Sequence, residues 1–353
     1  MKLLHVVGAR PNFVKASAVF RALASYPHIE QLLIHTGQHR GPDMSDVFFE
    51  QLALPEPEIN LQASSTSQAL QTAEIMQRFE PVLSDQRPDW VVVYGDVTST
   101  MAAALVCAKL GVRVAHVEAG LRSFDRTMPE EINRVVTDQL SDLLFTPSED
   151  GDRNLAREGI DPKKIHFVGN VMIDTLVRML PLAGDHMPAN VPKRYAVITL
   201  HRPSNVDDTN WMKEMLANLD EISTELPIIF PMHPRTCDRV RAAGITLPKG
   251  VRFSQALPYL DFLALLQKAA VVITDSGGIQ EETTFLNVPC LTVRENTERP
   301  VTVEYGTNQI VGRSFQRLRD ETLKILAGNV KQGHCPPRWD GQSSKRIAAL
   351  LTR

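Results

Sequence analysis

Acidic side chains that can exchange protons with a ligand stand in three motifs of the first half of the chain. Asp96 in VYGDVTST and Glu118 in HVEAGLRS each follow an apolar run typical of a buried strand. Glu130 and Glu131 stand side by side in MPEEINR. Carboxylates that follow parallel strands gather at one edge of the sheet, and several around one pocket can divide acid and base roles. These acids therefore mark a candidate site of acid–base chemistry.

Two of these acids also have a structural interpretation, which the sequence leaves open. Asp96 can cap a helix that begins at Thr98. Glu118 can pair with Arg122 or Arg134, because an acid at the end of a buried strand needs a specific partner.

A phosphate-binding signal lies in the second half of the chain, in TDSGGIQEE. Ser276, Gly277 and Gly278 stand where an apolar strand gives way to a helix. Glycines let a backbone approach an anion closely, and a helix N-terminus supplies N–H groups and positive potential. Glu282, further along this helix, is placed to accept hydrogen bonds from ribose hydroxyls. The structural alternative is a glycine turn with an ordinary helix cap. The motif matches neither GxGxxG nor GxxxxGKS/T, so neither NAD nor ATP chemistry follows.

Cations and histidines follow several of the predicted strands. Arg10 and Lys15 in GARPNFVK can stabilise a leaving diphosphate, although an exposed arginine and a solvated lysine are an equal alternative. His201 in TLHRPSN and His233 in PMHPR follow strands of the second half, and His39 in TGQHR follows a strand of the first. Such histidines can donate hydrogen bonds to phosphates or exchange protons near pH 7. HxxH and HExxH motifs are missing from the sequence, which argues against a dedicated metal site.

The elements that must position these residues alternate regularly along the chain. Short apolar runs without alternating polarity are typical of parallel strands covered on both faces. Their alternation with helical patterns, repeated in both halves, predicts an α/β protein with two doubly wound, Rossmann-like domains facing each other across a ligand-binding cleft. The predicted strands are Leu3–Val7, Leu32–His35, Trp90–Tyr94, Arg113–Val117, Leu143–Thr146, Ile165–Val168, Ala196–Leu200, Ile228–Met232, Val251–Phe253, Val271–Thr274, Cys290–Val293 and Gln309–Val311. The predicted helices include Phe13–Ala24, Ser67–Leu83, Met101–Lys109, Trp211–Leu219 and Leu260–Lys268.

Composition narrows the class of protein. The 353 residues carry 38 Lys and Arg against 41 Asp and Glu, and this balance offers no general attraction to nucleic acid or an anionic membrane. The longest apolar stretch, Met101–Ala108, is too short to span a bilayer, and the N-terminus is too short for a signal-peptide core. The four cysteines are scattered without a CxxC pair, so we expect reduced thiols in a cytoplasmic protein.

Taken together in chain order, the motifs resemble those of the non-hydrolysing UDP-N-acetylglucosamine 2-epimerases. The matching motifs are GARPNFVK, HTGQHR, YGDVTST, HVEAGLRS, MPEEINR, VGNVMIDT, TLHRP, HPR, TDSGGIQEE and ENTERP. The resemblance implies a two-domain fold like that of the B-type glycosyltransferases (GT-B-like) and interconversion of UDP-GlcNAc and UDP-ManNAc. It also implies a homodimer without a dissociable cofactor. The expected domains are 1–170 with the catalytic acids, 171–335 for UDP, and a helix in 336–353 that returns to the first domain, with a linker between about Gly169 and Arg194.

The resemblance also implies a mechanism and a set of site residues. UDP is eliminated to give 2-acetamidoglucal, and its return places a proton on the opposite face of C2. The implied catalytic residues are Asp96, Glu118, Glu130 and His201. The implied substrate-binding residues are Arg10, His201, Ser276, Gly277 and Gly278 at the diphosphate, Glu282 at the ribose, Phe262 at the uracil, and Lys15, His233 and Arg299 at further positions. The family's uracil-binding glutamine corresponds to Leu257, where only the backbone can serve.

Several alternatives remain open on the sequence alone. One is a 2-epimerase of UDP-2,3-diacetamido-glucuronic acid, whose family shares several of these motifs. Another is a glycosyltransferase of the same fold, which would not need the clustered acids. A hydrolysing epimerase and a UDP-sugar sensor are two more.

One segment departs from many bacterial members, which bind a second UDP-GlcNAc as an activator. The segment QHR at 38–40 is present, but Gly41 and Pro42 follow it where a second glutamine is expected. Lys and Arg are absent from the sequence between Arg40 and Arg78, although arginine is the usual anchor of a diphosphate. We therefore expect little or no activation by UDP-GlcNAc.

Overall fold

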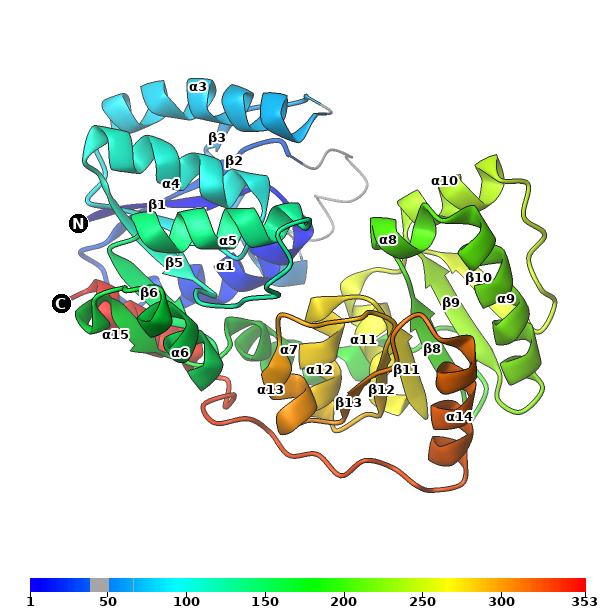
Figure 1. The fold of residues 1–353 in the computed structure, drawn as a ribbon. Helices are drawn as coiled ribbons and strands as arrows, with labels where there is room; N and C mark the ends of the chain where they lie inside the picture. Colours follow the sequence, from blue (N-terminus) through cyan, green and yellow to red (C-terminus); the bar gives the residue numbers. More distant parts are fainter. Residues whose placement is uncertain (39–50, 66) are drawn as a thin grey trace. The chain divides into compact units, whose positions relative to one another are not determined.

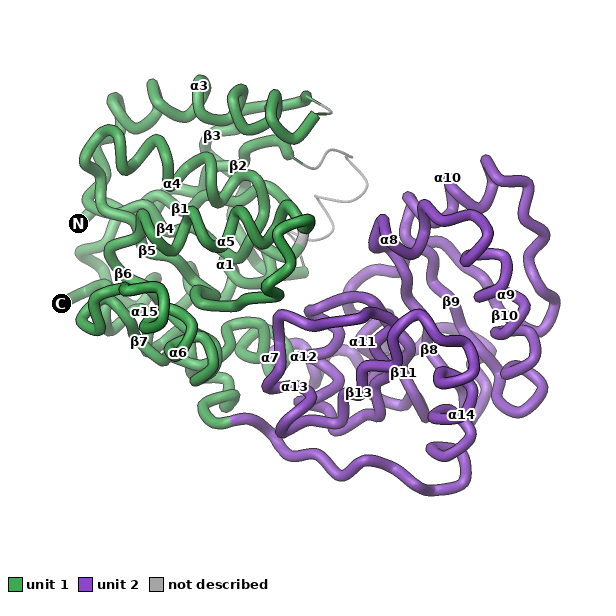
Figure 2. The backbone as a smooth tube through the Cα atoms, in the orientation of Figure 1, with its two compact units in different colours: residues 1–177, 337–353 green, residues 178–336 purple. Residues whose placement is uncertain are grey.

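The computed structural model describes residues 1–38, 51–65 and 67–353, without the side chain of Arg10. The chain forms two compact units, shown in Figure 2. Unit 1 comprises Met1–Val177 and Pro337–Arg353, and unit 2 comprises Arg178–Pro336. Each unit is built on one parallel sheet with helices in the crossovers, which confirms the predicted α/β class with two doubly wound sheets.

Unit 1 has a seven-stranded sheet in the order β3-β2-β1-β4-β5-β6-β7. Its strands are β1 (Lys2–Val7), β2 (Glu30–His35), β3 (Ile59–Asn60), β4 (Trp90–Tyr94), β5 (Arg113–Val117), β6 (Leu143–Thr146) and β7 (Ile165–Phe167). Its helices are α1 (Arg10–Leu23), α3 (Gln68–Gln86), α4 (Thr98–Leu110), α5 (Pro129–Leu140), α6 (Glu149–Arg157) and α15 (Ser343–Leu351). The helices α3, α4 and α5 lie side by side on one face of the sheet, whereas α1 packs against α15 (Figure 1).

Unit 2 has a six-stranded sheet in the order β10-β9-β8-β11-β12-β13. Its strands are β8 (Ala196–Thr199), β9 (Ile228–Met232), β10 (Val251–Gln255), β11 (Val271–Thr274), β12 (Cys290–Thr292) and β13 (Asn308–Ile310). Its helices are α8 (Pro203–Val206), α9 (Thr209–Ser223), α10 (Pro234–Ala242), α11 (Tyr259–Lys268), α12 (Gly277–Leu286), α13 (Pro300–Glu304) and α14 (Phe315–Leu326). Short 3₁₀ turns lie at Pro162–Lys164 in unit 1 and at Gly184–His186 in unit 2.

The strand predictions agree with these bounds to within about two residues at each end, because the buried apolar runs set them. Successive residues of β8 show why the runs lack alternating polarity. Ala196 and Ile198 belong to one core cluster, and Val197 belongs to another on the opposite face. A strand covered on both faces is apolar throughout. The sequence missed β3, which has only two residues, one of them the polar Asn60.

The unit boundary lies inside a helix, between Gly169 and Arg194. Helix α7 (Val171–Ala183) is continuous, and the boundary falls between Val177 and Arg178. The buried side chains of Val171, Ile173 and Leu176 give the first half of this helix an apolar face.

The second segment of unit 1 is anchored by specific contacts. The Asp174 carboxylate accepts hydrogen bonds from the backbone N–H of Ser343 (3.0 Å) and of Ser344 (2.6 Å), at the start of α15. Trp339 donates from Nε1 to the Pro147 carbonyl at 2.9 Å. The Asp174 contacts satisfy N–H groups at the beginning of the helix.

In both sheets the strand order reverses once, and the carboxyl ends of the strands beside that point are the usual ligand site of such folds. In unit 1 the reversal lies between β1 and β4. Asn12 joins the two strand ends there: its Oδ1 accepts from the N–H of Gly8 (3.1 Å) and Ala9 (3.2 Å), and its Nδ2 donates to the Tyr94 carbonyl (2.7 Å). In unit 2 the reversal lies between β8 and β11.

Cys107, Cys237 and Cys290 are free thiols. Among the residues that the structure describes, the helices are too short or too polar to cross a membrane.

Candidate active site

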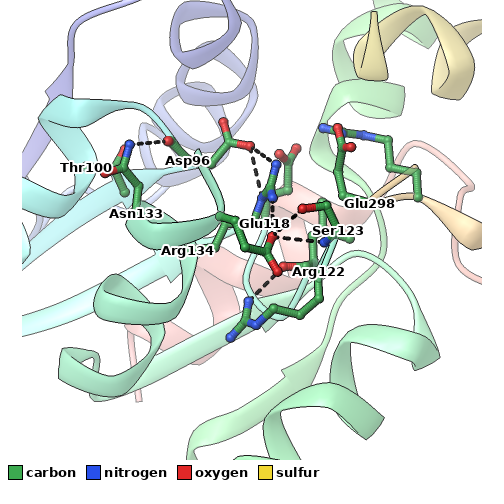
Figure 3. Close-up of polar contacts among 12 residues, drawn as sticks. Asp96, Thr100, Glu118, Arg122, Ser123, Asn133, Arg134 and Glu298 are labelled. Atoms are coloured by element: carbon green, nitrogen blue, oxygen red, sulfur yellow. Dashed lines mark hydrogen bonds and ion pairs between the residues drawn. The ribbon is translucent and has the colours of Figure 1, made fainter. Parts of the chain in front are cut away.

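Asp96 follows β4 and is held by helix α5, as Figure 3 shows. Its Oδ2 accepts from Nε (3.1 Å) and Nη2 (2.6 Å) of Arg134, and its carbonyl accepts from Asn133 Nδ2 at 2.8 Å. The N-cap of α4 is Val97, so the interpretation of Asp96 as the cap of the helix at Thr98 is wrong. The Asp96 carboxylate keeps about a fifth of its surface exposed, and it is therefore both oriented and accessible.

Glu118 follows β5 and pairs with a lysine from α1. Lys15 Nζ donates to Glu118 Oε1 at 2.7 Å, and both side chains are buried. The interpretation of Lys15 as a solvated lysine is therefore wrong. The expected alternative partner Arg122 instead contacts Asp138 at 2.7 Å.

The backbone around Glu118 is constrained. Glu118 adopts a φ of +75°, a left-handed conformation that is costly for a residue with a side chain. Gly95 (φ +62°) has no side chain, and a Cβ at this position would lie 2.6 Å from Lys15 Nζ. The glycine of the YGD motif thus leaves room for the Lys15–Glu118 pair.

The two adjacent acids at the start of α5 have different environments. Glu131 is buried and accepts from the N–H of Ser123 (2.9 Å) and of Phe124 (2.8 Å), while Arg134 Nη1 lies 2.6 Å from its Oε2. Glu131 therefore holds the loop before α5 in place. Glu130 is only half-buried, in the first turn of α5, and remains the candidate for proton transfer.

In unit 2, a buried aspartate joins the ends of β8 and β11. Asp275 Oδ1 lies 2.9 Å from His201 Nδ1, and its Oδ2 accepts from the Arg202 N–H (2.9 Å) and Asn205 Nδ2 (3.0 Å). Burial would raise the pKa of Asp275, but the charge of His201 and these hydrogen bonds lower it. The carboxylate thus orients the His201 ring by Nδ1 and leaves Nε2 as the nitrogen that can meet a ligand.

Arginines gather beside the N-terminus of α12. Glu298, fully buried, contacts Arg294 at 2.6 Å, Arg202 at 3.5 Å and the Arg299 guanidinium. A Cβ on Gly277 would lie 2.7 Å from Arg299 Cζ, so glycine is needed here to admit the arginine. Ser276 is the N-cap of α12 and its hydroxyl makes no capping hydrogen bond. Helix N-termini and guanidinium groups are the usual ligands of anions in proteins, so this is a candidate anion site.

Glu282 lies on α12 and is fully enclosed. Tyr259 on α11 donates from its hydroxyl to Glu282 Oε1 at 2.9 Å. Burial raises the pKa of Glu282 to about 7. The nearby Glu281 charge also raises this pKa, whereas the Tyr259 hydrogen bond lowers it. Phe262, on the same helix as Tyr259, is partly buried against the core of unit 2, as is Leu257.

The remaining predicted residues are placed as follows. His233 is the N-cap of α10, and its Nδ1 accepts from the Arg235 N–H at 3.2 Å; its ring lies 5.7 Å from that of His201. His39 and Arg40 lie outside the described residues, so the expectation about the activator is untested there. Arg78, the next cation along the chain, donates from Nη1 to the carbonyl of Leu61 at 2.6 Å.

Sequence reasoning missed several members of these networks. Asp275 directly follows a strand at the reversal point, and the criterion that selected Asp96 would have found it. Asp138 follows Glu131 and Arg134 at helical spacing, so its place on a charged face of α5 was visible. Within the described parts of the chain, His, Cys, Asp and Glu side chains form no cluster suited to a metal ion.

Comparisons with known proteins give the same family over nearly the whole chain. A family model described as UDP-N-acetylglucosamine 2-epimerase matches residues 21–352. A UDP-N-acetylglucosamine 2-epimerase of Methanocaldococcus jannaschii is 41% identical, over 100% of this chain and 99% of that protein. A UDP-2,3-diacetamido-2,3-dideoxy-D-glucuronate 2-epimerase of Pseudomonas aeruginosa is 38% identical over the full length of both. The crystal structure of the M. jannaschii UDP-GlcNAc 2-epimerase in complex with UDP-GlcNAc and UDP matches with a TM-score of 0.93 at 42% identity, covering 100% of this chain and 99% of that one.

Proposed function

The chain belongs to the UDP-N-acetylglucosamine 2-epimerase family of isomerases, and we propose that it interconverts UDP-GlcNAc and UDP-ManNAc by eliminating and re-adding UDP. The observation that carries the proposal is the pair of acids at one sheet edge. Asp96 and Glu118 end neighbouring strands, and each is oriented by a buried cation, Arg134 or Lys15. A reaction that moves a proton on and off one carbon needs such oriented acids.

The reaction requires loss of a proton that is not acidic in the ground state, because C2 of the sugar has no adjacent carbonyl. Departure of UDP builds positive charge at C1. A base then takes the C2 proton while the C1–O bond breaks and its electron pair leaves with the diphosphate, giving 2-acetamidoglucal and UDP. In the return step a diphosphate oxygen attacks C1, and an acid delivers a proton to the opposite face of C2.

We assign the proton transfers to Asp96, Glu118 and Glu130, together with His201, without dividing the two faces of C2 among them. The accessible Asp96 carboxylate and the half-buried Glu130 support this assignment. Asp275 would keep the His201 ring in a fixed orientation.

We assign the binding of UDP to the α12 N-terminus and its surroundings. A leaving diphosphate needs compensating positive charge, which the helix N-terminus and Arg299 can supply. The residues assigned to the diphosphate are Arg10, His201, Ser276, Gly277, Gly278 and Arg299. Glu282 is assigned to the ribose and Phe262 to the uracil, with Lys15 and His233 as further substrate contacts.

The test is incubation of the purified protein with UDP-GlcNAc in D₂O, followed by NMR at C2. We expect UDP-ManNAc with deuterium at C2, because the proton that leaves and the proton that returns use different faces and exchange with solvent. Product that keeps protium at C2 would contradict elimination and re-addition. Release of free ManNAc would indicate a hydrolysing enzyme instead.

A second substrate has a specific observation in its favour. The P. aeruginosa relative named for UDP-2,3-diacetamido-2,3-dideoxy-D-glucuronate is 38% identical over its full length, close to the 41% of the first relative. The same D₂O assay with that sugar decides between them. Faster C2 exchange with the diacetamido sugar than with UDP-GlcNAc would reassign the substrate.

We also propose that the enzyme works as a homodimer in the cytoplasm. The family resemblance supports the dimer, and the free thiols of Cys107, Cys237 and Cys290 suit a reducing compartment. Sedimentation of the purified protein tests the dimer, and a monomer at working concentration would contradict it.

A further inference from the structure

Two side chains that no assignment above uses join the acid-bearing loops of unit 1. They are His116 on β5 and Asp138 on α5, and both are fully buried. His116 Nε2 lies 2.8 Å from the carbonyl oxygen of Gly95, the residue directly before Asp96. His116 Nδ1 lies 2.7 Å from Asp138 Oδ1. The histidine therefore connects the loop after β4 to helix α5.

The other oxygen of Asp138 reaches the loop after β5. Asp138 Oδ2 accepts from the N–H of Gly120 at 3.1 Å and lies 2.7 Å from Arg122 Nη1. Arg122 is held in turn by Glu158, with Nε to Oε1 at 2.7 Å and Nη2 to Oε2 at 2.6 Å. Gly120 and Arg122 closely follow Glu118 in the chain. One carboxylate thus ties both loops that carry the candidate acids.

The hydrogen-bond partners define the charge of this pair. The Gly95 carbonyl can only accept, so His116 donates to it from Nε2. Asp138 accepts from Gly120 and contacts the Arg122 cation, which favours a carboxylate. Burial would raise the pKa of Asp138, but the charge and hydrogen bond of His116, and then the charge of Arg122, lower it. A carboxylate also only accepts, so the His116 ring donates from both nitrogens and carries a positive charge.

Resting on the proposed function, we propose that Asp138 is a positioning residue for the reaction: it holds His116 as a buried imidazolium and so fixes both acid-bearing loops. Such a tie is needed because Glu118 adopts a φ of +75°, which persists only where the surroundings enforce it. A displacement of a reacting group by about 1 Å can slow catalysis about 100-fold.

The first test reads the His116 ring directly and needs no sugar. In protein labelled with ¹⁵N-histidine, we expect both ring nitrogens of His116 to carry a hydrogen, because each faces an acceptor. The variant His116→Gln identifies the signal by its disappearance. In Asp138→Asn the new amide can donate to Nδ1, so we expect a neutral ring. A neutral His116 ring in the wild-type protein would overturn the proposal, whatever the protein's activity.

The second test separates positioning from stability. We expect Asp138→Asn to lower kcat about 10- to 100-fold, while KM and the Kd of UDP stay unchanged. The matched control is Asp174→Asn, which removes another buried carboxylate of unit 1 that accepts two backbone N–H groups at the start of α15. The control should lower Tm and leave kcat unchanged.

Two outcomes of the second test would overturn the proposal. One is wild-type kcat in Asp138→Asn, and the other is an equal loss of kcat in both variants. If the wild-type protein shows no exchange at C2 at all, the proposed function fails instead, and the state of the His116 ring alone decides whether Asp138 holds an imidazolium.

Discussion

The sheet edges of the two units follow one strand order but carry opposite kinds of chemistry. At the edge of unit 1, Asp96 and Glu118 each contact a buried cation, Arg134 or Lys15. At the edge of unit 2, the buried Glu298 contacts Arg294 and Arg299 beside a helix N-terminus, and the buried Glu281 contacts Arg299 at 2.8 Å. The first arrangement sets carboxylates at the strand ends, and the second sets arginines beside the N–H groups of a helix. The strand order that the two sheets share therefore decides where functional groups lie. The side chains on the adjacent helices and loops decide which charges those groups carry.

Of the changes that test this difference between the two edges, removal of an acid from the edge of unit 1 should have the largest effect on turnover. We expect Glu118→Gln to lower kcat by roughly 100-fold or more, the usual scale for an acid–base group, with the Kd of UDP unchanged because Glu118 is assigned to proton transfer at C2 and not to UDP. Steady-state kinetics and calorimetry measure the two quantities. Glu149→Gln, which changes an exposed acid on α6, is the control and should behave as wild type. Near wild-type turnover in Glu118→Gln would make Glu118 only a partner of Lys15.

The role of the unit 2 edge in UDP binding is tested by adding a side chain at Gly277. A methyl group there would displace the Arg299 guanidinium, so we expect Gly277→Ala to weaken UDP binding about 10- to 100-fold, the value of a charge-assisted hydrogen bond. Calorimetric titration with UDP measures the change. Gly184→Ala is the matched control, because a Cβ at Gly184 meets no atom within 4 Å. Equal Kd values for both variants would contradict the assignment of Arg299 to the diphosphate site.

A smaller effect concerns the pH dependence of the same edge. The pKa of Glu282 stands near 7, so the ligand-free carboxyl gains a proton as pH falls through 7. If ribose hydroxyls donate to the carboxylate, UDP binding must release that proton, and affinity should fall roughly 10-fold from pH 8 to pH 6. Titrations in buffers of different ionisation enthalpy count the proton. Glu282→Gln should abolish this slope, and a slope that survives the substitution would assign it to another group.

Topology was predictable from the sequence because buried strands are apolar and their ends converge. The positions of Asp96, Glu118 and Ser276 followed from that alone. Their partners did not follow, because a helix such as α5 can turn several residues toward a strand end. Glu131 and Glu130 are neighbours in sequence, yet one is enclosed by backbone N–H groups and the other is half-buried. Only the rotation of α5 separates them.

The sequence also could not show every reason for a glycine at position 277. Gly277 was expected to let the backbone approach a phosphate, whereas in the structure the missing Cβ makes room for Arg299. That arginine comes from a loop beyond the next strand, and a contact between segments so far apart in the chain has no local signature. The sequence therefore identified the motif but not the arginine that this glycine admits.

The division of unit 1 between two segments has a consequence for synthesis on the ribosome. Unit 2 is one continuous segment, whereas unit 1 is completed only by residues 337–353. The buried side chains of Ile347, Ala348 and Leu351 on α15, which packs against α1, are translated after all of unit 2. Domains usually fold as units in the order in which they leave the ribosome. In this chain the first unit to emerge must wait for the last helix, and the face of α1 is uncovered throughout elongation.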